Sequence, residues 1–212
     1  IPEPSPGPFD CLVKIDACAV CTGTDADIVY GDFPWRSPYP FILGHESTGL
    51  IMEVGSEVRN FQVGQRVTRP AGVLAGETIG GISSTWGGYA EWGLVRDVQA
   101  ARQAGVDASD MHASSRTPVP PGVDPISAAL SINQREILSV VQRIPFNERA
   151  RVVVIGSGYN GLLFSLFCKR FGAGRVALVG NPIFARLGME RYGADSFVDY
   201  KEVDTPAQVR DE

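Results

Sequence analysis

Five residues with metal-binding or proton-transferring side chains lie in two short stretches near the N-terminal end of the chain. Cys21, Thr24 and Asp25 belong to the first stretch, and His45 and Glu46 follow a loop rich in aromatic residues and proline. Thiolate sulfur, imidazole nitrogen and carboxylate oxygen are ligands that Zn²⁺ accepts in a roughly tetrahedral shell. A catalytic zinc site uses three protein ligands and leaves one position for water or substrate. The two stretches therefore predict a zinc site with an open position.

Each of the five residues has a role in such a site. Cys21 and His45 are the first two ligands, and Glu46 is either a transient ligand or part of the surrounding shell. An alcohol bound at the open position becomes more acidic, and the Thr24 hydroxyl can accept and pass on its proton. Asp25 can hold the far nitrogen of His45 and so fix the ring orientation. Together these roles describe the deprotonation of an alcohol beside a metal ion.

The same residues also have simpler interpretations. A single buried His is more often a hydrogen-bonded core residue than a ligand, and a single Cys usually packs as a small hydrophobe. Cys18 and Cys21 form a C-x-x-C pair, a spacing also found in redox pairs and zinc ribbons. No second pair of this kind occurs in the sequence, which disfavours both alternatives.

A second candidate site follows an apolar run in the last third of the chain. Residues 152–155 predict a strand buried on both faces of a parallel sheet, and a helix is expected over 162–171. Between them stands a G-x-G-x-x-G motif. Its glycines allow a tight turn, close approach of the backbone to a pyrophosphate, and packing of the helix on the strand. The cofactor-binding residues predicted in this loop are Gly156, Gly158, Tyr159, Asn160 and Gly161.

The residues after the next predicted strand, 176–179, bear on the choice between NAD and NADP. An acid about 20 positions after the glycines would hold the ribose 2′-hydroxyl of NAD and repel a 2′-phosphate. Gly180 and Asn181 stand there, and neither is acidic. Asn181 and Arg186 are candidates to contact a 2′-phosphate, although Pro182 occupies the place of the expected basic neighbour. We therefore expect NADP, with NAD as the alternative.

Composition excludes several functional classes. The chain has 212 residues, of which 44% are hydrophobic and 20% charged, and its net charge is -5. This charge argues against a nucleic-acid surface, and the absence of a long apolar segment argues against a membrane span. Four cysteines are too few for a disulfide framework, and a zinc thiolate needs reducing surroundings. We expect a cytoplasmic protein with no nucleic-acid or membrane partner, and a homo-oligomer, either a dimer or a tetramer.

The motifs resemble those of the medium-chain dehydrogenase/reductase superfamily, and more narrowly its zinc-dependent alcohol and polyol dehydrogenase branch. The resemblance is carried by Ala19-Val20-Cys21, Thr24-Asp25, residues 40–49, Val54-Gly55 and residues 63–67. It implies that Cys21 and His45 bind catalytic zinc, that Thr24 belongs to the proton relay and that Glu46 sits beside the metal. It also implies an α/β protein in which a chaperonin-10-like barrel is followed by a Rossmann doubly wound parallel sheet.

The sequence departs from the family pattern between the first ligand and the relay hydroxyl. The family has one residue there, whereas Thr22 and Gly23 separate Cys21 from Thr24, so we expect a bulge or a shifted hydroxyl. Residues 70–85, where many relatives carry a lobe with four cysteines, contain none. No structural zinc is therefore expected.

A further departure concerns the third zinc ligand. In the family it would fall near Ile132 or Asn133, and neither is a good ligand. The candidates to replace it are Asn133, Gln134 and Glu136, or Glu46 as a permanent ligand.

The expected elements place these residues in two domains. A half-buried strand over 11–17, a short helix over 25–30 capped by Thr24, and further strands up to residue 95 form the first. We assign residues 1–124 to the catalytic domain, 125–150 to a linking helix that starts at Pro125 and is capped by Asp124, and 151–212 to the first half of a Rossmann domain. Because only three Rossmann strands are expected, we predict that the protein continues beyond this chain.

We expect the chain to belong to an enzyme, an NAD(P)-dependent alcohol or polyol dehydrogenase that transfers hydride between a secondary alcohol and nicotinamide. Its substrate is a small-molecule alcohol or carbonyl compound. Trp35, Trp86 and Tyr89 are expected to line the substrate pocket, and His112 to lie in a surface loop. The alternatives are a zinc-free NADPH-dependent reductase of the same superfamily and a non-catalytic nucleotide-binding relative.

Overall fold

The computed structural model describes residues 2–34, 39–108, 115–202 and 205–211. The chain forms two compact units, Ile1–Ile132 and Asn133–Glu212, and their boundary falls inside helix α3 (Pro125–Val141). This helix begins where the sequence predicted, because the carboxylate of Asp124 accepts a hydrogen bond from the backbone N–H of Ser127 at 3.0 Å. Within the described residues, no helix has the length and apolar character needed to cross a membrane.

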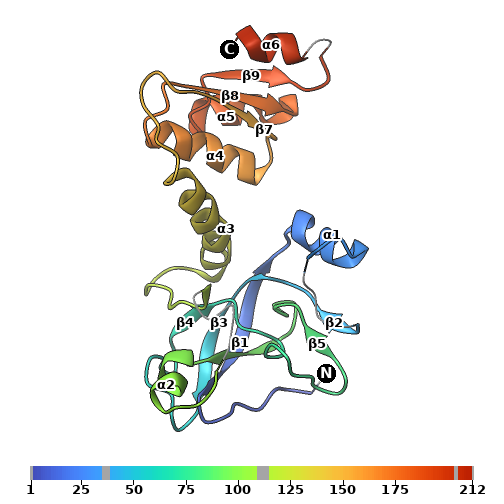
Figure 1. Cartoon of the computed structure of the whole chain (residues 1–212), viewed down its shortest axis with the longest axis vertical. Coiled ribbons are helices and arrows are strands. Elements are labelled where there is room, and N and C mark those ends of the chain that lie inside the picture. Colours follow the sequence, from blue (N-terminus) through green and yellow to red (C-terminus); the bar gives the residue numbers. More distant parts are fainter. Residues whose placement is uncertain (1, 35–38, 109–114, 203–204, 212) are drawn as a thin grey trace. The chain divides into compact units, whose positions relative to one another are not determined.

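The first unit is built on an antiparallel sheet with the strand order β4-β3-β1-β6 (Figure 1). Its strands are β1 (Asp10–Ala19), β3 (Glu46–Val54), β4 (Arg66–Thr68) and β6 (Trp92–Arg96). Two shorter strands, β2 (Phe41–Ile42) and β5 (Ser83–Ser84), pair in parallel beside it. A segment that contains Gly55 and Gly64 separates β3 from β4.

Strand β1 is more deeply buried than its alternating pattern predicted. Cys11 and Val13 pack with Ile51 and Val95 in one apolar cluster, while Leu12 packs with Leu94 in another. Both faces of the strand are therefore covered in its first half, rather than one. Only its second half, from Lys14 onward, reaches partial exposure.

Helix α1 (Thr22–Tyr30) begins earlier than the sequence predicted. Its N-cap is Cys21 rather than Thr24, and the backbone N–H of Asp25 donates to the Cys21 carbonyl at 3.0 Å. The helix ends at Gly31, whose φ of 86° lies in the left-handed region that favours glycine. The additional residue before Thr24 is thus absorbed into the first helical turn, and the expected bulge does not form.

A second helix, α2 (Val98–Gln103), follows β6 and was not predicted from the sequence. Asp97 is buried at its N-cap and accepts a hydrogen bond from Ala100 N–H at 3.0 Å. The same carboxylate accepts from the backbone N–H groups of Arg59 and Asn60, each at 2.8 Å. Burial raises the pKa of Asp97, but these hydrogen bonds outweigh it and hold the pKa below its ordinary value.

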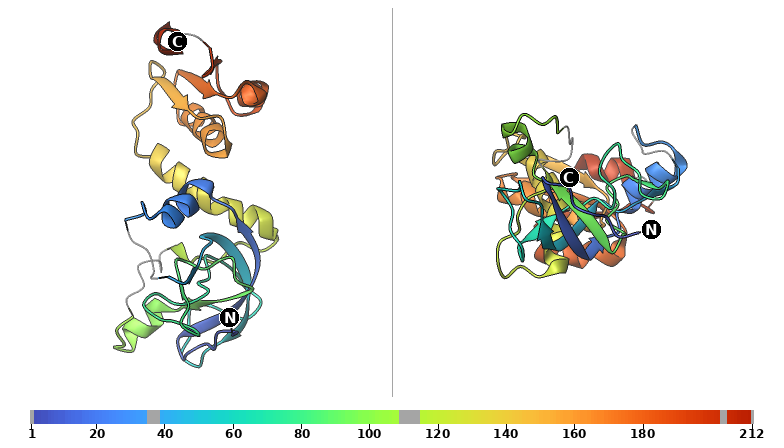
Figure 2. Two further views of the ribbon diagram at one scale, coloured as in Figure 1. Left: turned by 90° about the vertical axis from the view of Figure 1, so that its right-hand side faces the viewer. Right: turned by 90° about the horizontal axis from the view of Figure 1, so that it is seen from below.

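The second unit is a parallel sheet with the order β7-β8-β9, and α4 and α5 lie beside it (Figures 1 and 2). Its elements are β7 (Arg151–Ile155), α4 (Tyr159–Arg170), β8 (Arg175–Gly180), the 3-10 helix η2 (Pro182–Phe184), α5 (Ala185–Arg191), β9 (Ser196–Asp199) and α6 (Thr205–Asp211). Strands thus alternate with helices, as in the expected βαβ units. Leu162 of α4 and Leu178 of β8 belong to the apolar core of this unit.

Strand β7 differs from the expectation of burial on both faces. Val154 is buried, but Val153 is 41% exposed and Ile155 85% exposed. Successive side chains of a strand point to opposite faces, so Val154 lies on the covered face, and Val153 and Ile155 lie on the face that the described residues leave exposed. The apolar run therefore predicted the strand correctly but predicted more burial than the strand has.

Candidate metal centre and nucleotide loop

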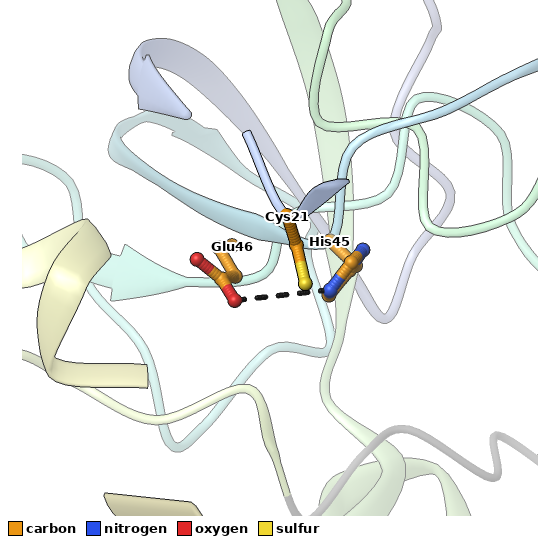
Figure 3. Close-up of side chains that lie close together, drawn as sticks. All are labelled: Cys21, His45 and Glu46. Atoms are coloured by element: carbon orange, nitrogen blue, oxygen red, sulfur yellow. Dashed lines mark ion pairs between the residues drawn. The ribbon is translucent and has the colours of Figure 1, made fainter. Parts of the chain in front are cut away.

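Cys21, His45 and Glu46 converge in the first unit (Figure 3). The sulfur, one ring nitrogen and one carboxylate oxygen all lie within 4.8 Å of one another, and His45 Nε2 is 3.9 Å from Glu46 Oε1. His45 and Glu46 are buried, whereas Cys21 is half-buried. A tetrahedral zinc site with bonds of 2.0–2.3 Å would separate its ligand atoms by roughly 3.3–3.8 Å. The donor set therefore fits zinc in chemistry and needs only a small contraction to fit in size.

The position of His45 is fixed by backbone contacts on both sides of it. Gly44 has a φ of 96°, and a Cβ there would lie 2.7 Å from the backbone nitrogen of Tyr89. The carbonyl of Gly44 accepts from Gly88 N–H at 2.7 Å, and the carbonyl of His45 accepts from Arg69 Nε at 2.9 Å. The glycine that precedes His45 is thus required by a close approach of two loops.

A carboxylate and a phenol lie behind His45. Asp25 Oδ1 is 3.4 Å from His45 Nδ1, and neither atom makes a hydrogen bond within the described residues. The other oxygen, Oδ2, accepts from the Tyr89 hydroxyl at 2.5 Å. Burial, followed by this hydrogen bond, raises the pKa of Tyr89, so the phenol remains a donor at neutral pH. The structure thus brings Asp25 to the far nitrogen of His45, where the sequence predicted it.

Thr24 lies one helical turn after Cys21. The two side chains are in contact, with Cys21 Sγ 3.7 Å from Thr24 Oγ1. The hydroxyl expected in the proton relay is therefore beside the sulfur of the candidate ligand, although one more residue separates them than in the family pattern.

Two aromatic rings border the candidate metal centre. The Trp86 ring lies 5.2 Å from the His45 ring and 5.9 Å from Phe33, measured between centroids. Trp86 has a φ of 65°, which is unusual for a bulky residue and concentrates at functional sites. Of the three expected pocket residues, Trp86 and Tyr89 are thus at the centre. Trp35 lies outside the described residues, as does His112.

The positions considered for a third ligand lie in α3. Ile132 and Asn133 are buried, and Gln134 donates to the Tyr159 hydroxyl at 2.8 Å. Among the described residues, Cys21, His45 and Glu46 form the only His, Cys, Asp or Glu group close enough to hold a metal ion. Among the described residues of the first unit, Glu46 is thus the candidate for the third donor.

The glycine motif of the second unit forms the turn between β7 and α4. Gly156 has a φ of 112°, and its N–H donates to the carbonyl of Val179 in β8 at 2.8 Å. A Cβ on Gly161 would lie 1.7 Å from the Gly156 carbonyl oxygen, whereas a Cβ on Gly158 would meet nothing within 4 Å. The N-terminus of α4 thus opens onto free space beside Gly158, its N-cap.

The residues after β8 are arranged by a serine that the sequence analysis did not single out. Ser157, the x of the first G-x-G, is buried, and its hydroxyl accepts from Asn181 N–H at 2.8 Å. The side chain of Asn181 caps η2 by accepting from Ile183 N–H at 3.1 Å. Gly180 is buried against Ser157, while Asn181 and Arg186 are exposed. A small polar residue between the glycines was the available signal for this contact.

Residues 7–104 match the family model of the alcohol dehydrogenase GroES-like domain. The NADP-dependent isopropanol dehydrogenase of Thermoanaerobacter brockii is 32% identical over 219 residues, which cover 98% of this chain and 59% of that protein. The sorbitol dehydrogenase of Halalkalibacterium halodurans (strain C-125) is 31% identical over 207 residues, covering 96% and 58%. The chain thus spans less than two thirds of the length of these relatives.

The fold is also found in solved structures. A structure described as a zinc-binding dehydrogenase from Sinorhizobium meliloti 1021, bound to NADP, has a TM-score of 0.73 and 30% sequence identity. The similarity covers 96% of this chain and 58% of that one. The predicted fold class, a GroES-like domain followed by a Rossmann-type parallel sheet, is confirmed. Residues 7–104 thus form a GroES-like domain of the alcohol dehydrogenase family, and the chain is similar over nearly its whole length to alcohol and polyol dehydrogenases, as its motifs indicated.

Proposed function

We propose that this chain carries the metal centre and the nucleotide loop of an NAD(P)-dependent alcohol or polyol dehydrogenase. The reaction is hydride transfer between a secondary alcohol and nicotinamide, and the substrate is a small-molecule alcohol or the corresponding carbonyl compound. The observation that carries the proposal is the convergence of Cys21, His45 and Glu46. The relatives whose names describe alcohol and sorbitol dehydrogenases support it.

Zinc would be held by Cys21, His45 and Glu46, which supply sulfur, nitrogen and oxygen donors. When bound, the metal supplies a Lewis acid that makes an alcohol hydroxyl more acidic. Thr24, whose hydroxyl lies 3.7 Å from the Cys21 sulfur, would accept the released proton and pass it on. Because Cys21 is half-buried while the two other donors are buried, we place the exchangeable position on the side of Cys21.

The surrounding side chains would set orientation and exclude water. Asp25 Oδ1, 3.4 Å from His45 Nδ1, would accept a hydrogen bond from the ring and direct Nε2 towards the other donors. The Trp86 ring would cover the open side of His45 and give the substrate an apolar wall. An apolar wall favours the carbon chain of an alcohol and strengthens the electrostatic interactions beside it.

The dinucleotide would bind at the turn from Gly156 to Gly161. The open space at Gly158 fits a pyrophosphate close to the backbone, and the N–H groups of Tyr159 and Asn160 begin the helix that would face it. We propose NADP over NAD, because Gly180 and Asn181 provide no carboxylate to repel a 2′-phosphate. Asn181 and Arg186 are both exposed where they could contact it. The NADP-binding relatives support this preference.

We also propose residues 1–124 as the catalytic domain, 125–150 as the linker and 151–212 as the first part of the dinucleotide-binding domain. The boundary between the compact units inside α3 is compatible with this division. A homo-oligomer remains a prediction.

The experiment that tests the function is a cofactor reduction assay with a panel of secondary alcohols and polyols. We expect the purified protein to reduce NADP⁺ faster than NAD⁺, to lose the activity on treatment with a zinc chelator and to regain it with added Zn²⁺. Reduction of an activated double bond by NADPH in chelator-treated protein would instead assign the chain to the zinc-free reductases. Nucleotide binding without turnover of any alcohol would indicate a non-catalytic relative.

A further inference from the structure

Three side chains from separate parts of the first unit form a continuous line that ends at the candidate metal centre. The Tyr89 hydroxyl donates to Asp25 Oδ2 at 2.5 Å, and Asp25 Oδ1 lies 3.4 Å from His45 Nδ1. The opposite ring nitrogen, Nε2, faces Glu46 at 3.9 Å. The Tyr89 hydroxyl therefore holds one carboxylate oxygen of Asp25, while the other, which makes no hydrogen bond within the described residues, lies beside the imidazole.

The line connects the two segments that carry the candidate ligands. Asp25 lies in the first turn of α1, whose N-cap is Cys21. Tyr89 lies in a loop held to the segment before His45, because Tyr89 N–H donates to the Leu43 carbonyl at 3.0 Å. A hydrogen bond between Tyr89 and Asp25 consequently ties the segment of Cys21 to the segment of His45.

The environment of Asp25 makes this hydrogen bond consequential. Its side chain is 13% exposed and that of His45 7% exposed, so the Tyr89 hydroxyl, which approaches from the exposed side, holds an otherwise buried carboxylate. A phenol bonded to a carboxylate forms a charge-assisted hydrogen bond, which is shorter and stronger than one between neutral groups. Without it, one oxygen of Asp25 would be left without its donor and the carboxylate would be freer to rotate away from His45.

We infer that Tyr89 is a positioning residue of the metal centre, whose hydroxyl locks Asp25 in the orientation that aims His45 Nε2 at Cys21 and Glu46. The inference rests on the proposed function, since it assumes that these residues hold a metal. Tyr89 would not bind the metal itself. It would position the ligands through Asp25 and through the link between the two segments that carry Cys21 and His45.

A purely packing or substrate-contacting role is the competing explanation. The Tyr89 ring also lines a surface cavity of about 400 Å³ together with Ile42 and Trp92. Tyr89→Phe separates the two roles, because phenylalanine keeps the ring in place and removes only the hydroxyl. Tyr39→Phe is the matched control, since the Tyr39 hydroxyl also donates to α1, to the Val29 carbonyl at 3.3 Å, but does not reach Asp25.

The test is a titration of metal-free protein with Co²⁺, followed by the visible absorption of the bound ion and by competition with a chelator. We expect Tyr89→Phe to weaken Co²⁺ binding about tenfold and to change the absorption bands, as loss of an outer hydrogen-bond partner does at metal sites. Tyr39→Phe should bind Co²⁺ as the unmodified protein does. Thermal unfolding of the metal-free variants controls for folding, which the conservative change at a 44% exposed residue should preserve.

A double-mutant cycle shows whether Tyr89 acts through Asp25. If it does, Asp25→Ala weakens Co²⁺ binding, and adding Tyr89→Phe to that variant weakens it no further. Equal Co²⁺ affinity and spectrum in Tyr89→Phe and the unmodified protein would overturn the inference and leave the proposed function standing. Additive losses in the cycle would overturn the route through Asp25. Failure of the unmodified protein to bind Co²⁺ would instead remove the metal centre, and with it both proposals.

Discussion

The two candidate sites of this chain are built from opposite parts of the polypeptide. The first gathers side-chain donors, Cys21, His45 and Glu46, from two segments. The second offers backbone N–H groups at the turn from Gly156 to Gly161 and has few side chains of its own. One site therefore depends on which functional groups are present, and the other depends on which groups are absent.

The glycines show the same contrast. At Gly44 a Cβ would meet protein atoms at 2.7 Å, so the glycine serves the packing of the protein itself. At Gly158 a Cβ would meet nothing within 4 Å, and its φ of -73° is ordinary for any residue. The protein alone therefore does not require glycine at position 158, and a bound pyrophosphate would. Substitutions in the two regions should accordingly have separable effects.

The largest effect is expected at the side-chain site, from Cys21→Ser. Loss of the thiolate should lower kcat for alcohol oxidation by roughly 10³-fold, because a bound metal stabilises the transition state by several kcal/mol. NADP⁺ affinity, measured by calorimetry, should stay within about threefold, a change worth roughly 0.65 kcal/mol. If NADP⁺ affinity falls together with activity, the metal centre and the nucleotide loop are not independent sites.

Cys18→Ser is the matched control for that substitution, since Cys18 belongs to the same C-x-x-C pair. Burial raises the pKa of the Cys18 thiol to about 12, so it stays protonated at neutral pH and is a poor ligand. We expect this variant to keep its activity and its metal content. A loss of activity as large as that of Cys21→Ser would indicate that Cys18 and Cys21 both bind the metal.

At the backbone site, Gly158→Val should weaken NADP⁺ binding by about 10- to 100-fold, because the branched side chain would fill the space proposed for the pyrophosphate. Co²⁺ binding to the first unit should be unchanged. Both affinities can be measured on one preparation. Undiminished nucleotide affinity in this variant would refute the assignment of the phosphate loop.

Gly161→Ala sharpens the comparison within the glycine motif. Its Cβ would lie 1.7 Å from the Gly156 carbonyl oxygen, so we expect a loss of about 3 kcal/mol in the free energy of unfolding. Gly158→Ala, where the space is open, should change that free energy by less than about 0.5 kcal/mol. Urea denaturation of the two variants measures the difference. Equal stabilities of the two variants would show that Gly161 is not required by the packing of the protein more than Gly158 is.

The smallest effect is expected from Asn181→Asp, which adds a charge while keeping the cap of η2. The carboxylate should repel a 2′-phosphate and raise the Kd of NADP⁺ roughly tenfold, with little change for NAD⁺. Asn147→Asp is the control, because Asn147 makes the same kind of turn by accepting from Arg149 N–H at 2.9 Å. If both variants shift NADP⁺ binding equally, net charge rather than a local contact is responsible.

The sequence predicted best what is local. The residues that converge at the candidate metal centre, the strand and helix around the glycine motif and the capped start of α3 all lie in short sequence patterns. It predicted less well what depends on distant neighbours. No pattern links Tyr89 to Asp25 across 64 residues, and the start of α1 depends on the backbone at Cys21 rather than on a capping side chain.

Burial was the other quantity that short patterns could not supply. The first half of β1 is covered on both faces, although its alternation predicted one, and β7 is exposed at Ile155 although its apolar run predicted burial. In each case the number of neighbouring layers decides the outcome, and that number is a property of the assembled sheet. The burial of Asp97, which caps α2, also depends on distant residues, since two of its backbone donors come from residues 59 and 60.

The central claim is that Cys21, His45 and Glu46 share one zinc ion. Its most direct test is an anomalous difference map from crystals of the protein grown with Zn²⁺, recorded on both sides of the zinc absorption edge. We expect a single strong peak within about 2.0–2.3 Å of Cys21 Sγ, His45 Nε2 and a Glu46 carboxylate oxygen. The claim is contradicted if the map is empty there and the sulfur and the ring nitrogen point apart.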